Sequence, residues 1–144
     1  MELNLNNELP GYSLKEILFT NAITKVQRAL RDQDGCPVII KSFEIAYPSQ
    51  RQRQCFLLSY ELLRKFEHQN ITKALDYFER DGLPVMVLED KQSIDLCQHA
   101  KQVSDQPFPV DAFLNIAIQL ADALSVIHHA QVIHKDLHPG NILI

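Results

Sequence analysis

The stretch Val132-Ile-His134-Lys-Asp136-Leu-His138-Pro-Gly-Asn141-Ile-Leu-Ile144 decides how the rest of the chain is interpreted. It follows a long apolar helical pattern, and it begins and ends with short apolar runs. Its side chains that can transfer a proton or bind a cation are His134, Asp136, His138 and Asn141. A polar loop between a helix and a strand explains this hydrophobic pattern, but it does not explain why these residue types occur in this order.

A metal site is a second hypothesis for this stretch. His134 and His138 are four residues apart, and either His128 or His129 could add a third ligand. Such a site needs its ligands on one rigid face, whereas Pro139 follows at once and cannot continue a helix. The spacing therefore favours a loop over a metal site.

The composition is that of a globular domain and argues against several classes of protein. The chain has 144 residues, of which 46% are hydrophobic and 22% charged, with a formal net charge of −4. This balance lacks the basic stripe of a nucleic-acid-binding protein, and no apolar run approaches the roughly 18 residues of a membrane span. The first residues lack the regions of a signal peptide. A reducing cytoplasm is expected because three widely spaced cysteines form neither a disulfide framework nor a zinc pattern; they are Cys36, Cys55 and Cys97.

The first half of the sequence is predicted to form strands around one helix. A helix starts after Ser49, where Ser49 and Gln52 match a capping box. Asp-Gly turns precede the third and the fifth predicted strands. The β-compatible runs are residues 12–19, 25–30, 37–43, 71–79 and 83–88. Helical spacing predicts that the buried stripe of the helix consists of Cys55, Leu58, Leu62 and Phe66.

The second half is predicted to be helical. Residues 93–101 form a short helix candidate, 104–109 a loop, and 110–129 a long helix that is apolar over most of its circumference. Such a helix is normally buried inside a larger helical body, and the residues that follow it are too few to supply one. We therefore expect a chain that is cut short, with an exposed apolar face that self-associates or binds a partner domain supplying the missing helices.

The stretch quoted first resembles the catalytic loop of eukaryotic-type protein kinases, in which His-Arg-Asp-Leu is followed by three residues, an asparagine and a short apolar strand. By this resemblance, Asp136 accepts the proton of the substrate hydroxyl and Asn141 binds magnesium. His134 supports the loop. Lys135 stands where the family carries arginine, and His138 stands where a lysine usually contacts the transferred phosphate.

A second resemblance lies in the third predicted strand. Val38-Ile-Ile-Lys41 is similar to the Val-Ala-Ile-Lys strand whose lysine pairs with the α- and β-phosphates of ATP. A helix, a hairpin, the apolar-then-acidic run 87–90 and a long helix follow in the order of this family. The resemblance implies a gatekeeper at Leu88, a hinge at 89–91 and an adenine-pocket floor at Leu143. The nucleotide-binding set that it implies is Leu18, Val26, Ile39, Lys41, Leu88, Glu89, Asp90, Lys91 and Leu143.

Two features depart from the family pattern. Glycine lets backbone amides approach phosphate closely, but the positions of the three loop glycines are Phe19, Asn21 and Thr24. The helix glutamate that pairs with the lysine is expected at Ser59, and Glu61 lies two residues further on. Either the register slips locally or Lys41 lacks that partner.

Together these patterns predict an α+β fold, namely a five-stranded antiparallel sheet with one helix, followed by an incomplete and mainly helical lobe. Residues 1–11 form an N-terminal extension, 12–90 the first lobe and hinge, and 91–144 a partial second lobe ending just after the catalytic loop. The style of the motifs resembles most the kinase domain at the start of large bacterial multidomain sensor histidine kinases.

The implied activity is that of a cytoplasmic serine/threonine protein kinase that uses ATP and magnesium to phosphorylate a protein substrate, with no nucleic-acid or membrane partner. Because the chain ends before any Asp-Phe-Gly, we expect it to be inactive by itself. A pseudokinase-like binding module or a decayed gene fragment is the alternative.

Overall fold

The computed structural model describes residues 9–103 and 107–144, and the chain divides into two compact units. Unit 1 comprises Met1–Lys65 and Thr72–Lys91, and unit 2 comprises Phe66–Ile71 and Gln92–Ile144. The chain therefore leaves unit 1 after Lys65, contributes the short segment Phe66–Ile71 to unit 2, and returns to unit 1 at Thr72. Most of the predicted N-terminal extension, and residues 104–106 of the predicted loop, lie outside the described residues.

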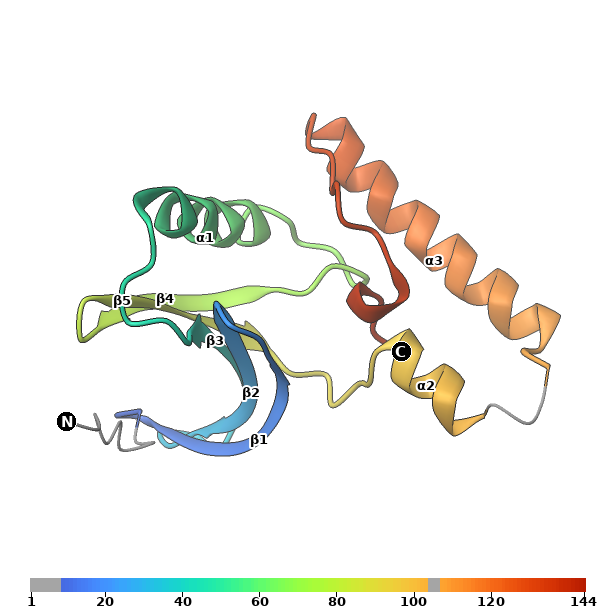
Figure 1. Ribbon diagram of the computed structural model, residues 1–144. Helices are drawn as coiled ribbons and strands as arrows, with labels where there is room; N and C mark the ends of the chain where they lie inside the picture. The colour runs from blue at the N-terminus through green and yellow to red at the C-terminus, as the bar shows by residue number, and fades with distance from the viewer. Residues whose placement is uncertain (1–8, 104–106) are drawn as a thin grey trace. The chain divides into compact units, whose positions relative to one another are not determined.

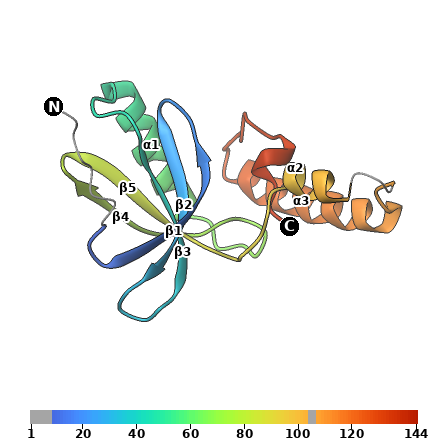
Figure 2. The ribbon, with the colours of Figure 1, turned by 60° about the horizontal axis from the view of Figure 1, so that its bottom comes forward.

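Unit 1 is a five-stranded antiparallel sheet with one helix. The strand order is β1-β2-β3-β5-β4, and Figures 1 and 2 show this sheet from two directions. The elements in chain order are β1 (Tyr12–Thr20), β2 (Thr24–Arg31), β3 (Pro37–Phe43), α1 (Gln50–Leu63), β4 (Ala74–Arg80) and β5 (Leu83–Glu89). The predicted strands, helix and sheet are confirmed.

The hairpin between β4 and β5 turns at an Asp-Gly pair, as predicted. Asp81 and Gly82 both have positive φ values, 52° and 73°. Such a turn matches the twist of the two strands, and glycine adopts this backbone conformation without strain. Arg53 of α1 donates a hydrogen bond to the carbonyl oxygen of Gly82 at 2.7 Å. The hairpin is therefore tied to the helix at its tip.

Both faces of the sheet are packed. One face carries a buried cluster, whereas the other face receives α1 through aromatic contacts. The first cluster consists of Leu9, Ala29, Val38, Ile40, Val85 and Val87. The second consists of Phe43, Phe56 and Met86, with Tyr60, Leu63 and Tyr77 among the residues packed against it.

The face that α1 turns to the sheet differs from the prediction. The predicted stripe of Cys55, Leu58, Leu62 and Phe66 is not the buried one, since Cys55 is exposed and Leu58 is 53% exposed. Instead Phe56 is buried, and its ring centroid lies 5.0 Å from that of Phe43. The capping box is confirmed: the backbone N–H of Ser49 donates to Gln52 Oε1 at 2.7 Å, and the N–H of Gln52 donates to Ser49 Oγ at 3.3 Å.

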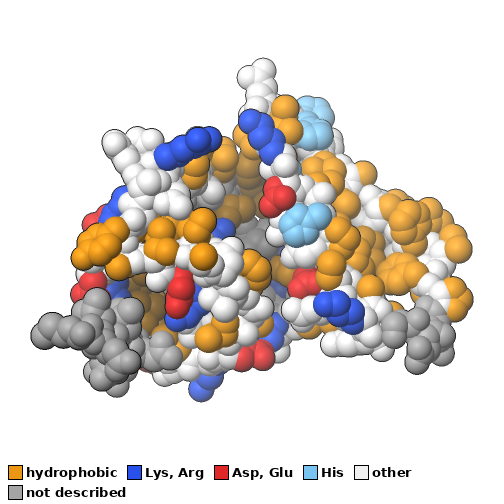
Figure 3. All heavy atoms as spheres, viewed as in Figure 1, with side chains coloured by type: hydrophobic (Ala, Val, Ile, Leu, Met, Phe, Trp, Pro, Cys, Tyr) orange, Lys and Arg blue, Asp and Glu red, His pale blue; other side chains and the backbone are white. Residues whose placement is uncertain are grey.

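Unit 2 is mainly helical, as predicted. It contains α2 (Leu96–Gln102), α3 (Val110–His129) and the short 3-10 helix η1 (Pro139–Asn141). Within the described part of α3 only Ala123 is fully buried. Figure 3 shows hydrophobic side chains gathered over α3. Four large apolar side chains of this helix are at least half exposed: Val110, Phe113, Leu114 and Ile118.

One sequence expectation about α3 is wrong. Within the described ranges α3 is the one helix long and apolar enough to cross a membrane, with 20 residues and a mean hydropathy of 1.6. Core helices of soluble proteins meet the same criterion but are mostly buried, whereas 6% of the apolar window of α3 is buried. Here Asp122 Oδ2 of α3 lies 3.0 Å from His68 Nε2, and Asn70 donates to the carbonyl oxygen of Gln119 at 3.4 Å. These polar contacts join α3 to the segment Phe66–Ile71 within unit 2.

Candidate active site

Four of the predicted nucleotide-binding side chains share one face of the sheet in unit 1. In the register of the strands Val26 pairs with Lys41, and Ile39 pairs with Leu88. Paired residues lie on the same face, and so do residues two apart on one strand. All four side chains are half-buried. The sheet therefore brings together Lys41 and three apolar side chains on one face.

Leu18, the fifth predicted residue of this group, lies in a bulge of β1. The register passes from Ile17 opposite Gln27 to Phe19 opposite Val26, so Leu18 is the extra residue. A bulged residue has no cross-strand partner and its strand bends. Leu18 is half-buried.

Lys41 is surrounded by apolar side chains rather than by a counter-charge. Its Nζ lies 6.0 Å from the ring centroid of Phe56. Within residues 9–103 and 107–144 no carboxylate forms an ion pair with Lys41. Removal from water disfavours the ammonium form and lowers the pKa of Lys41 from its ordinary value of 10.5. An anionic ligand would provide the missing counter-charge.

The helix glutamate expected from the family is absent from the position facing Lys41. Glu61 is exposed, and at about 100° per residue it lies about 140° around the helix from Phe56. Ser59, at the expected position, donates its hydroxyl to the carbonyl oxygen of Cys55 at 2.8 Å. The sequence left open whether the helix register slips locally or Lys41 lacks a glutamate partner. In the structure Lys41 lacks this partner on α1.

The predicted hinge begins with a residue that is held on two sides. The backbone N–H of Glu89 donates to the carbonyl oxygen of Lys73 at 3.0 Å, and the N–H of Lys73 donates to Glu89 Oε1 at 2.9 Å. Lys91 Nζ lies 3.5 Å from the same carboxylate oxygen. These contacts fix the chain where it leaves β5.

Arg28 is a residue of this region that sequence reasoning missed. Its Nε donates to Asp90 Oδ2 at 3.0 Å, and the side chain of Asp90 is only 5% exposed. Arg28 also pairs with Glu16. The hydrogen bond to Glu16, and then the charge of Asp90, raise the pKa of Arg28 against the opposing effect of burial. The carboxylate of Asp90 therefore forms a structural ion pair with Arg28. The sequence signal that could have identified Arg28 is its position two residues from Val26, which places both side chains on one face of β2.

The turn between β1 and β2 is shaped by an asparagine side chain. Asn21 Oδ1 accepts hydrogen bonds from the backbone N–H groups of Ile23 and Thr24, both at 2.8 Å. A glycine-rich loop would leave such amides available to a phosphate. Here two of them already have an acceptor, so this turn offers a phosphate less than the family's loop does.

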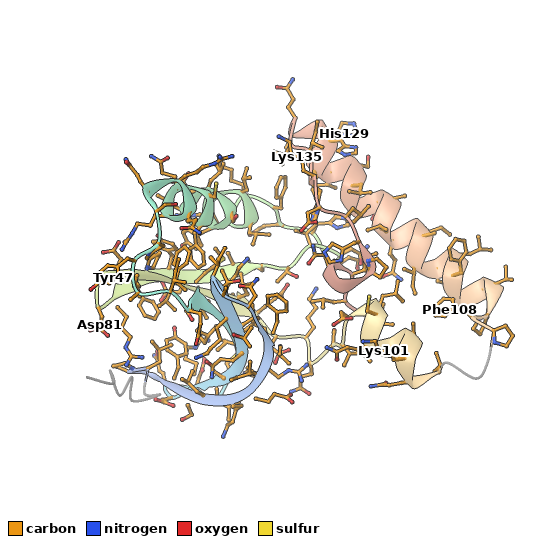
Figure 4. The ribbon with its side chains drawn as sticks, viewed as in Figure 1. Tyr47, Asp81, Lys101, Phe108, His129 and Lys135 are labelled. Carbon is orange, nitrogen blue, oxygen red and sulfur yellow. The ribbon has the colours of Figure 1, made fainter. Side chains whose placement is uncertain are left out.

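In unit 2 the predicted catalytic loop follows α3 through a sharply turned backbone. Gln131 and Lys135 both have positive φ values, 59° and 63°. This conformation costs a residue other than glycine about 1–2 kcal/mol, and such strain often occurs at functional sites. The N–H of Asp136 donates to His134 Nδ1 at 3.3 Å, which supports the turn. Figure 4 shows Lys135 and His129 at the same end of unit 2.

Asp136 and Asn141 are in direct contact. Asn141 Nδ2 donates to the backbone oxygen of Asp136 at 2.9 Å and lies 3.2 Å from Asp136 Oδ2. Among the residues that the structure describes, no group donates to Asn141 Oδ1, which leaves this oxygen for a cation. The side chain of Asp136 is 77% exposed. The carboxylate is therefore open to solvent, and the amide oxygen of Asn141 is of the ligand type that magnesium prefers.

His138 lies against this pair. Its Nε2 is 3.0 Å from Asn141 Nδ2 and 3.7 Å from Asp136 Oδ2, and its Nδ1 accepts from the N–H of Gly140 at 3.1 Å. A Cβ at Gly140 would approach the Cε1 of His138 to 3.0 Å. Glycine is thus the residue that lets the backbone pass this close to the imidazole ring.

The metal hypothesis for the histidines finds no support in the described ranges. There, no group of three or more His, Cys, Asp or Glu side chains could hold a metal ion. His134 and His138 instead accept hydrogen bonds from backbone amides.

The apolar run after the loop pairs with the segment before α2. Leu143 forms an isolated antiparallel bridge with Asp95, and the backbone N–H groups of Ile94 and Ile144 donate to each other's carbonyl oxygens at 3.2 and 2.9 Å. The side chain of Leu143 is 55% exposed. The roles predicted for all of these side chains stay predictions.

Comparisons with known proteins agree with the motifs. Residues 12–144 match the model of the protein kinase domain. Serine/threonine-protein kinase 36 of Pongo abelii is 29% identical over 133 residues, which cover 92% of this chain and 10% of that protein. Mitogen-activated protein kinase spk1 of Schizosaccharomyces pombe is 30% identical over 150 residues, which cover 98% of this chain and 38% of that protein. The chain therefore spans well under half the length of these two relatives.

The fold agrees as well. The kinase domain of PknI from Mycobacterium tuberculosis superimposes with a TM-score of 0.76 at 24% identity, over 93% of this chain and 54% of that one. With the family model matched from β1 to the last residue, the chain belongs to the protein kinase domain family.

Proposed function

We propose that this chain provides the nucleotide-binding sheet and the catalytic loop of a serine/threonine protein kinase, which transfers the γ-phosphoryl group of ATP to a hydroxyl of a protein substrate. The observation that carries the proposal is the direct contact of Asp136 with Asn141. Family membership and the two relatives described above, whose names specify protein kinases, support it.

The residues divide the chemistry between them. Asp136 accepts the proton of the substrate hydroxyl, and Asn141 offers Oδ1 as a ligand for magnesium. Lys41 pairs with the α- and β-phosphates, and the apolar face around it receives the adenine. Magnesium, when bound with ATP, neutralises charge that develops on the phosphates, and catalysis otherwise rests on positioning and electrostatics.

Turnover by the protein that contains this segment tests the proposal. Asp136→Ala is expected to lower kcat by at least about 100-fold, which is the usual minimum contribution of a general base, with ATP affinity nearly unchanged. His138→Ala is the neighbouring control and is expected to lower kcat less than Asp136→Ala does. Phosphate transfer from radiolabelled ATP measures both. An unchanged rate in the Asp136 variant would show that this carboxylate is not the base.

A non-catalytic binding module is the second candidate, and two observations favour it. Lys41 has no carboxylate partner in the described part of the chain, and the amides of Ile23 and Thr24 already bind Asn21. Such a module would bind ATP weakly and transfer no phosphate. ATP binding that Lys41→Met abolishes, in a protein without measurable turnover, would favour this candidate over the kinase.

We further place this activity in the bacterial cytoplasm, in a larger signalling protein of the sensor histidine kinase type. The motif style supports the protein type, and three free cysteines are compatible with a reducing compartment. The exposed apolar residues of α3 support a partner domain that packs against this helix.

A further inference from the structure

Arg28 joins three segments of unit 1 that surround the proposed nucleotide site. It lies on β2, and its side chain forms ion pairs with Glu16 of β1 and with Asp90, the residue that follows β5. These partners are 12 and 62 positions away along the chain. The two ion pairs therefore connect the β1-β2 hairpin to the predicted hinge.

The ion pair with Asp90 lies on the face of the sheet that carries Lys41. In the register of the strands Arg28 pairs with Ile39, and Ile39 pairs with Leu88, so these three side chains share one face. Neighbouring strands are about 4.8 Å apart, and β3 lies between β2 and β5. The side chain of Arg28 therefore reaches across β3 toward the end of β5, beside the apolar residues Ile39 and Leu88.

Burial makes this ion pair sensitive to the loss of either partner. The side chain of Asp90 is 5% exposed, and the side chain of Arg28 is 22% exposed. Removing one partner of a buried ion pair leaves the other charge without compensation in a poorly solvated place. Without Arg28 the carboxylate of Asp90 would have to turn toward water, which displaces the backbone of the hinge.

The neighbouring hinge residue Glu89 is held from the opposite side. Its backbone and its carboxylate are hydrogen-bonded to the backbone of Lys73, which precedes β4. Because β4 and β2 lie on different sides of β5 in the strand order, the hinge is fixed from both directions. Arg28 supplies the contact from the direction of β2.

We propose that Arg28 is a positioning residue for nucleotide binding, because its ion pair with Asp90 holds the hinge where the hinge receives the base of ATP. Arg28 acts through Asp90, and the phosphates are left to Lys41. This inference rests on the proposed function of the site. It adds that the base and the phosphates depend on two different cations of the same face.

The test compares ATP with adenosine, which carries the base and the ribose but no phosphate. Isothermal titration calorimetry measures both affinities in the 144-residue chain, at a temperature at which tyrosine fluorescence shows unit 1 of each variant to be folded. Arg28→Leu is expected to weaken both ligands at least about tenfold, which is the scale of a lost hydrogen bond between charged groups. Lys41→Met is expected to weaken ATP and to leave the affinity for adenosine within about twofold.

Arg31→Leu is the matched control. Arg31 also lies on β2 and also pairs with a carboxylate, but its partner Asp34 is three residues away in the turn that leads to β3. This variant is expected to change neither affinity by more than about twofold.

Asp90→Asn provides a second route to the same contact and keeps the test decisive if Arg28→Leu fails to fold. It removes the charge with little change of shape, and it is expected to weaken both ligands as Arg28→Leu does. The double variant Arg28→Leu, Asp90→Asn is expected to lose no more affinity than either single variant, because residues that act through one contact are not additive.

Several results would overturn the inference while leaving the proposed function in place. These are unchanged affinities in Arg28→Leu or Asp90→Asn, a loss of ATP binding without a loss of adenosine binding, an equal loss in Arg31→Leu, or losses that multiply in the double variant. A wild-type chain that binds neither ligand would contradict the proposed function and this inference together.

Discussion

The candidate sites of the two units are built in different ways. In unit 1 Lys41 and Ile39 lie on a strand in the middle of a packed sheet, with partners on both neighbouring strands. In unit 2 Asp136 and Asn141 lie on an exposed loop. The hydrogen bonds that the side chains of this loop form join residues at most five positions apart, and the apolar run that follows pairs with the segment before α2. The sheet therefore positions its residues through the core, whereas the loop positions its residues through short-range contacts. Substitutions in the sheet should change stability, and substitutions in the loop should change chemistry alone.

The largest expected effect concerns the packing that positions α1. Phe56→Ala removes a buried ring and is expected to lower the free energy of unfolding by about 3 kcal/mol. Leu57→Ala, one residue further along the same helix and partly exposed, is the control and is expected to cost about 0.5 kcal/mol. The chain has no tryptophan, and its four tyrosines all lie in unit 1. Tyrosine fluorescence during urea unfolding therefore reports on unit 1.

The same urea unfolding measurement tests whether the loop of unit 2 contributes to the stability of unit 1. Asp136→Ala is expected to leave the tyrosine transition unchanged, because the loop belongs to unit 2. A loss of stability in that variant comparable to the loss in Phe56→Ala would show that the loop is part of the packing of unit 1.

The change in stability expected from a substitution of Lys41 is smaller than that from Phe56→Ala and has the opposite sign. Lys41→Met is expected to raise the free energy of unfolding by about 1 kcal/mol, since it removes a desolvated cation that has no carboxylate partner among the described residues. Because the folded pKa of Lys41 is lowered, the unfolded chain binds more protons than the folded chain between that pKa and the ordinary 10.5. The stability of the wild-type chain should therefore rise with pH through this window.

Urea unfolding at several alkaline pH values checks this result. In the Lys41→Met variant the free energy of unfolding should rise less steeply with pH, because the contribution of Lys41 is absent. A variant less stable than the wild type would mean that the contact with Phe56 outweighs desolvation.

The smallest effect on stability is expected at the exposed residues of α3. The double variant Leu114→Gln, Ile118→Gln should change the free energy of unfolding by no more than about 0.5 kcal/mol per site, since both side chains are at least half exposed. The wild-type chain is expected to bind a hydrophobic dye or to self-associate, and the variant is expected to do so less. A monodisperse wild-type chain without a dye signal would contradict this account of α3.

Much of the fold follows from local sequence signals. The Asp-Gly pairs at 34–35 and 81–82, between β-compatible runs, predicted the hairpins β2-β3 and β4-β5, and the capping box at Ser49 predicted the start of α1. The buried face of α1 was not predictable in the same way. Its two faces offer apolar residues at equal spacing, and the aromatic rings of Phe56 and Tyr60 decide between them by reaching the sheet.

The candidate site was predictable where a motif covers it and not where distant contacts form it. Asp136 and Asn141 lie within one motif, so their contact agrees with the sequence pattern. Arg28 carries no motif, and an arginine on a strand is usually an exposed charge. Its partners Glu16 and Asp90 lie 12 and 62 residues away, and only the folded sheet brings them together.

The measurement that tests the account most directly is ATP affinity in three chains: wild type, Lys41→Met and Asp136→Ala. Lys41→Met is expected to weaken ATP binding at least tenfold, or about 1.4 kcal/mol, because it removes the cation that pairs with the phosphates. Asp136→Ala should bind ATP as the wild type does, because a base acts in the chemical step. Equal affinity in all three chains, or a loss in the Asp136 variant alone, would contradict the division of binding and chemistry between the sheet and the loop.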